Sequence, residues 1–99
     1  MRSVKTSLGV VDFDVEDLVL KHGQEKRPIS TRKWYQGRLG DYEIVIQWYE
    51  GQGVDQEYKH VFLLGPGGGI CTIGGGPLLK QAVEDIERLF GVRVKLSSS

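Results

Sequence analysis

The glycines that precede the last predicted helix are the residues best suited to bind an anion. Seven of the thirteen residues from Gly65 to Pro77 are glycine. Gly74, Gly75 and Gly76 come directly before the helix, and Lys80 falls in its first turn. Free N–H groups and the positive end of the helix dipole attract anions at such a terminus. The segment therefore predicts a small-anion or small-ligand site as one of two candidate functions.

The same segment lacks the specific phosphate-binding motifs. No G-x-G-x-x-G spacing occurs from Gly65 onward, and a P-loop would require Lys and Ser or Thr where Gly75 and Gly76 stand. Glycines also permit a hairpin turn, a bend in a strand or the close approach of another backbone. We favour this structural interpretation of the glycine run over an anion site.

Cys71 and His60 raise the possibility of a nucleophile and its general base. A hairpin in which Leu64 faces Gly69 would place both residues on one sheet face, diagonally and about 7–8 Å apart. That separation exceeds a hydrogen bond, and an apolar setting raises the pKa of a thiol. We therefore expect Cys71 to be a buried, inert cysteine, and we predict no catalytic residue.

Acidic and histidine residues offer no convincing metal site. Asp12, Asp14 and Glu16 are the right ligand type for Mg²⁺ or Ca²⁺, but no EF-hand-like loop surrounds them. His22 and His60 are too few and too far apart for a recognisable zinc motif. We expect neither a metal nor any other cofactor.

The segment EKRPISTRKWYQGR, residues 25–38, interleaves basic and aromatic residues. Such a mixture suits single-stranded nucleic acid, because bases stack on rings and phosphates pair with cations. In a strand, however, Trp34 points away from Lys33 and Tyr35, so the three cannot reach one ligand. Nucleic acid is therefore not the expected partner.

Composition limits the remaining function classes. The 99 residues suit one domain, expected over residues 1–96 with a frayed tail at 97–99. Basic and acidic residues balance at 13 each, although residues 1–38 have a net charge of +3 and residues 39–99 of −3. A neutral chain is not drawn to nucleic acid or acidic membranes. The asymmetry is compatible with head-to-tail self-association, but we favour the interpretation that both halves mix in one sheet and their charges cancel. The single cysteine fits the cytoplasm, and no apolar run suggests a leader or membrane anchor.

Alternating apolar residues predict several strands. The clearest is 42–50, where Tyr42, Ile44, Ile46 and Trp48 alternate with a half-polar second face. Further strands are expected at 3–13, 29–36, 58–64, 69–73 and 92–96, with loops at 23–30 and 51–57. Residues 14–22 fit both a strand and a short helix, of which we favour the helix because Gly23 would cap it.

The helix expected over 77–90 has an apolar stripe on one side. Its members are Leu79, Ala82, Val83, Ile86 and Phe90. Pro77 suits the first helical position and Gly91 the end. The predicted fold is α+β, an antiparallel sheet of five to six strands with this C-terminal helix on one face.

One long helix cannot cover both faces of such a sheet. The second face, around Val45, Gln47 and Tyr49 and with Tyr35, is expected to be a contact surface because Trp and Tyr favour interfaces. Our leading interpretation is a non-enzymatic binding or regulatory module that forms a homodimer or binds another protein through this face.

Overall fold

The computed structural model describes residues 1–51 and 57–98, and alternating apolar residues form most of its strands. The strands are β1 (Arg2–Thr6), β2 (Gly9–Phe13), β3 (Asp17–Lys26), β4 (Ser30–Leu39), β5 (Tyr42–Gly51), β6 (Lys59–Leu64), β7 (Ile70–Gly76) and β8 (Arg93–Ser97). The helix is α1 (Leu79–Phe90). Of the loop predicted at 51–57, residues 52–56 lie outside the described part of the chain.

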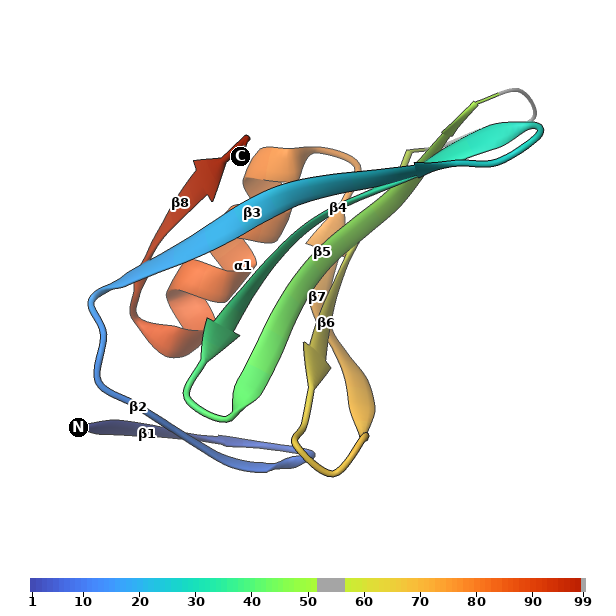
Figure 1. Ribbon diagram of the computed structural model, residues 1–99. Helices are drawn as coiled ribbons and strands as arrows, with labels where there is room; N and C mark the ends of the chain where they lie inside the picture. Colours follow the sequence, from blue (N-terminus) through green and yellow to red (C-terminus); the bar gives the residue numbers. More distant parts are fainter. Residues whose placement is uncertain (52–56, 99) are drawn as a thin grey trace.

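A six-stranded sheet forms the body of the molecule, in the order β7-β6-β5-β4-β3-β8. Neighbours pair antiparallel except β3 and β8, which are parallel because α1 carries the chain across the sheet before β8 begins. A separate hairpin, β1 and β2, lies beside one end of the sheet (Figure 1). The α+β class and the C-terminal helix are confirmed.

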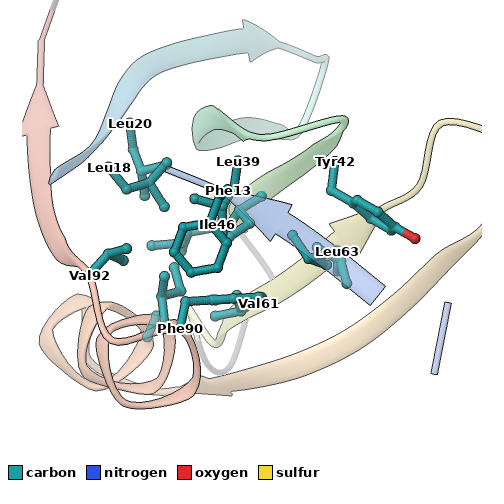
Figure 2. Packing of buried hydrophobic residues seen from close by; sticks show 14 of the residues in the cluster. Phe13, Leu18, Leu20, Leu39, Tyr42, Ile46, Val61, Leu63, Phe90 and Val92 are labelled. Carbon is teal, nitrogen blue, oxygen red and sulfur yellow. The ribbon is translucent and has the colours of Figure 1, made fainter. Parts of the chain in front are cut away.

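The core fills the space between α1, the hairpin and one face of the sheet. Strand β5 contributes the predicted alternation, since Tyr42, Ile44, Ile46 and Trp48 are all buried. The ring of Phe13 from β2 meets that of Phe90 from α1 edge to face, with centroids 6.1 Å apart. Figure 2 shows these side chains converging from both ends of the sequence.

The favoured helix at 14–22 is wrong, because most of this segment belongs to β3. Leu18 and Leu20 are buried, while Val19 between them and Lys21 after them are exposed, which is the period of a strand. Residues Asp17–Lys21 pair with β8, and Lys21–Lys26 pair with β4. The predicted loop at 23–30 is correspondingly shorter, since β3 continues to Lys26.

The predicted register between β6 and β7 is also wrong by one residue. Leu64 pairs with Ile70 rather than Gly69, because Gly68 adopts a φ of 91° and adds a bulged residue to the turn. A second irregularity lies between Val61 and Phe62. Strand β7 extends to Gly76, three residues beyond the predicted end of this strand, and includes Gly74, Gly75 and Gly76.

Helix α1 begins two residues later than predicted. Pro77 precedes it, and Leu78 is the N-cap residue, whose N–H donates to Oε1 of Gln81 at 3.0 Å. Gly91 ends the helix as predicted, in the left-handed conformation with a φ of 68°. Beyond it Val92 is buried, whereas Leu96 is 41% exposed on the edge strand β8. That strand continues through Ser97, the first residue of the expected tail.

Candidate functional site

One face of the six-stranded sheet has no described element packed against it, and we call it the open face. Because side chains alternate along strands, this face takes the residues of β5 between the buried ones, together with their neighbours on β4, β6 and β7. Its members on these strands include Arg32, Trp34, Gln36, Arg38, Glu43, Val45, Gln47, Tyr49, His60, Phe62, Leu64, Ile70 and Thr72. The opposite face carries the core.

A shallow apolar groove of about 280 Å³ lies on the open face. Val45, Phe62, Leu64 and Ile70 supply its apolar surface from three adjacent strands, and Arg32 and Gln47 line it as polar groups. Val45 is nearly buried by its neighbours, whereas Ile70 at the edge is 62% exposed.

Arg32 is held rigidly at the margin of the groove. Its Nε and Nη2 both donate to Oε1 of Gln47, at 2.9 and 2.6 Å. Its guanidinium also lies 4.6 Å from the centre of the Trp34 ring, within the range of a cation–π contact. No described carboxylate pairs with Arg32, so it presents a positive charge to whatever contacts the groove.

Of the predicted contact residues, Val45, Gln47 and Tyr49 lie together on the open face. Tyr49 is 37% exposed, and Arg27 lies over its ring at 5.6 Å. Tyr35 does not join them, because it pairs with Ile46 and therefore points to the core side. There its ring stacks on Trp48 with centroids 6.0 Å apart.

Sequence reasoning missed Phe62, Leu64 and Ile70 as parts of this surface. The available signal was that strands β6 and β7 are apolar on both sides near their turn. Strands that are apolar on both sides usually lie centrally in a sheet or under another layer. In the structure β7 is the outermost strand, so its second apolar side faces outward instead.

The candidate anion site is already occupied by the chain's own groups. Gly75 N–H donates to Oδ2 of Asp85 at 2.9 Å, so a carboxylate of α1 takes the place that an anion would have. A Cβ on Gly74 would collide with that same carboxylate, and one on Gly76 with Gln81. The glycines therefore permit β7 to pack closely against α1. Lys80 is exposed, and no described contact brings it to these glycines.

The candidate nucleophile and base lie on opposite faces of the sheet. Cys71 pairs with Leu63 and packs against the core, while His60 is exposed on the open face beside Tyr58 and Phe62. The predicted arrangement on one face is thus incorrect, and the one-residue change in register is the reason. Cys71 is a free, half-buried thiol.

The acidic residues near the N-terminus bind separate partners. Asp12 accepts a hydrogen bond from the hydroxyl of Ser3, Asp14 lies 3.8 Å from the terminal amine, and Glu16 lies 4.0 Å from Arg93. Within residues 1–51 and 57–98, no three His, Cys, Asp or Glu side chains are grouped to hold a metal ion. The three acids do not converge on one point.

A partly exposed ion pair lies on the core side of the sheet, near the end of β5. Lys33 Nζ and Trp48 Nε1 each approach a different oxygen of Glu50 at 2.8 Å. The hydrogen bond from Lys33, followed by that from Trp48, lowers the pKa of Glu50 from its ordinary value of 4.5. The cluster stabilises the fold, and it lies on the face opposite the groove.

Together these features define a small α+β sheet protein with an apolar groove on a face that no described element covers. The chain is 32% identical over 95 aligned residues to the cell division protein FtsA of Streptococcus pneumoniae serotype 2. The alignment covers 82% of this chain but 21% of that protein, so the chain spans about a fifth of its relative's length. No known protein family and no solved structure matches the chain. None of the helices described here is long and apolar enough to cross a membrane.

Proposed function

We propose that the chain is a non-enzymatic binding or regulatory module whose open face contacts protein, and that this contact makes it a homodimer. The groove carries the proposal, because Phe62, Leu64 and Ile70 leave apolar area in contact with water. Burial of apolar area is the main source of free energy in protein association. Val45, Gln47 and Tyr49 form the rest of the contact surface.

A second copy is a suitable occupant of the groove. The groove floor of Val45, Phe62 and Leu64 carries no charge, so a two-fold axis through it brings no like charges together at the centre. Polar and charged residues surround it, among them Arg32, Gln36 and Glu43. An apolar centre with a polar rim is the usual anatomy of an interface.

The similarity to FtsA supports a role in cell division for this module. That protein is named a cell division protein, and the alignment reaches most of the present chain. We place the module in the cytoplasm, in keeping with the free Cys71 and the lack of an internal disulfide. Depletion of the chain in its own cell should alter cell length or septum spacing, and normal division after full depletion would contradict this role.

Phe62→Lys tests the contact surface directly. The variant adds a second positive charge beside Arg32 and removes apolar area from the groove, so self-association measured by sedimentation equilibrium should weaken. Leu89→Lys is the matched control, because Leu89 is a 39% exposed apolar residue on α1. A native chain that stays monomeric at its highest soluble concentration, or equal weakening by both variants, would contradict the proposal.

A further inference from the structure

Strand β7 is an uncharged outer edge of the sheet. None of its residues, Ile70–Gly76, carries a charge. Natural edge strands are usually protected by charges, proline, bulges or a covering element, since free backbone groups invite another strand. In β7 both protections lie at one end, where the register irregularity falls at Ile73 and Asp85 accepts the hydrogen bond from Gly75 N–H. Figure 1 shows the opposite end of β7 lying away from α1, next to the β6–β7 turn.

The turn geometry shows which backbone groups of β7 face outward. Gly65 N–H donates to the Gly69 carbonyl at 2.8 Å, which fixes this pair as hydrogen-bonded. Hydrogen-bonded and non-hydrogen-bonded pairs alternate along an antiparallel ladder. Ile70 and Thr72, opposite Leu64 and Phe62, are therefore non-hydrogen-bonded positions whose N–H and C=O groups point away from β6. No described group forms a hydrogen bond with these outward N–H and C=O groups of Ile70 and Thr72.

We propose that a second copy of the chain pairs with this edge, its own β7 running antiparallel, with the two-fold axis at Cys71. In this register each Ile70 lies opposite the partner's Thr72, and the outward N–H and C=O groups of both residues are satisfied. The two sheets become one continuous sheet. This contact is distinct from the groove contact proposed above, and either can form without the other.

The length of the free edge is the reason a second copy fits it. The partner's β7 begins at Ile70, directly after its turn, so in this register its extended segment ends opposite Thr72. It therefore stops short of Gly75, where Asp85 closes the edge. A longer extended peptide in the same register would continue into that carboxylate and α1.

Cys71 offers a direct probe of the register. On the two-fold axis the two Cys71 residues form a non-hydrogen-bonded pair, with Cα atoms about 4.5 Å apart. That separation is within the range of a disulfide, about 4.4–6.8 Å. Diamide should therefore oxidise the two thiols to an intersubunit disulfide, taking up their two electrons and two protons. The expected product is a covalent dimer on a non-reducing gel. Dithiothreitol should reduce this dimer to monomers, and Cys71→Ser should not form it.

Thr72→Pro separates edge pairing from the fold. Its N–H points outward, so proline removes a donor from the proposed interface without removing a bond to β6. Losing this hydrogen bond on both copies should weaken association roughly tenfold and reduce the disulfide product. Thr72→Lys, at an exposed position, should do the same by placing two cations near the axis.

Leu96→Pro is the matched control on the other edge. Arg93 N–H points toward β3 and donates to the Glu16 carbonyl. Backbone N–H directions alternate along a strand, so the N–H of Leu96, three residues later, points away from the sheet. This variant should keep the self-association and the disulfide yield of the native chain. Phe62→Lys should keep the disulfide yield. Failure of the native chain to cross-link, or undiminished cross-linking in both Thr72 variants, would overturn edge pairing. Loss of association in Phe62→Lys with no cross-link in the native chain would favour the groove contact alone.

Discussion

The two outer strands of the sheet are protected in different ways. On β8, Glu87 of α1 accepts a hydrogen bond from Val94 N–H at 3.0 Å, and Arg93 and Lys95 lie 2.9 and 3.6 Å from Asp17 on β3. On β7, Asp85 of α1 caps Gly75 in the same manner, but the strand has no charged side chain. One edge thus combines a helix cap with charges, while the other has the cap and the register irregularity at Ile73 but no charge.

The shared use of α1 shows how the sheet is shaped. Asp85 and Glu87 are two residues apart, and at 3.6 residues per turn their side chains point in nearly opposite directions. Each reaches a different outer strand, so the sheet must curve round the helix (Figure 1). The concave side holds the core, and the open face is the convex side. Edge protection in this fold therefore depends on the packing of α1.

Ile86→Ala should have the largest effect because it loosens the element that protects both edges. Ile86 is fully buried between α1 and the sheet, and its truncation should lower the free energy of unfolding by about 2–5 kcal/mol. Denaturant unfolding measures this change, with Leu89→Ala on the exposed side of α1 as the control. A loss below that of the control would show that α1 contributes little to the sheet's stability.

Gly75→Ala tests the part of β7 that α1 covers. Gly75 has a φ of 150°, and an added Cβ would lie 2.4 Å from the Lys59 carbonyl oxygen. The variant should lose roughly 1–3 kcal/mol of stability through backbone strain. Gly67→Ala in the turn, where nothing lies within 4 Å of the new Cβ, should be neutral or slightly stabilising. Equal stability of the two variants would contradict the close packing of β7 described here.

Local patterns were sufficient to predict the central strand and the helix. The alternation from Tyr42 to Trp48 and the stripe through Ala82, Ile86 and Phe90 each match one period, and both sets are buried. The segment 14–22 fits two periods, and the choice depends on β8, whose residues lie more than seventy positions later. Such ambiguity is resolved by tertiary pairing, which no local pattern contains.

The open face was predicted only in part for a related reason. Val45, Gln47 and Tyr49 belong to one strand, so their common face follows from alternation alone. Placing Tyr35, Phe62 and Ile70 relative to them requires the registers of β4, β6 and β7, and a shift of one residue transfers a side chain to the other face. The bulged turn at Gly68 supplies such a shift.

Asp85→Ala and Glu87→Ala compare the two helix caps. Each variant leaves one strand N–H without its carboxylate, and each should lose about 1–2 kcal/mol of stability. Their effects on self-association should differ. Removing Asp85 opens more of the uncharged β7 edge and should strengthen association in sedimentation experiments, whereas the charges of β8 should still protect its edge in Glu87→Ala. Identical association in both variants would show that the two edges are equivalent.

The pH dependence of stability has a further contribution from Glu50, which lies on β5 away from both edges. Its pKa is lowered by the hydrogen bonds from Lys33 and Trp48, so the ionised form stabilises the fold. This stabilisation is complete above the pKa of an unfolded glutamate and is lost as the pH falls through the lowered folded value. Glu50→Gln should therefore be less stable than the native chain at neutral pH, and the gap should close on acidification. Unfolding midpoints of both chains measured from neutral pH to below 4.5, the ordinary glutamate pKa, test this. A gap that persists at the acid end would assign the loss of stability to altered packing instead of to the charge of Glu50.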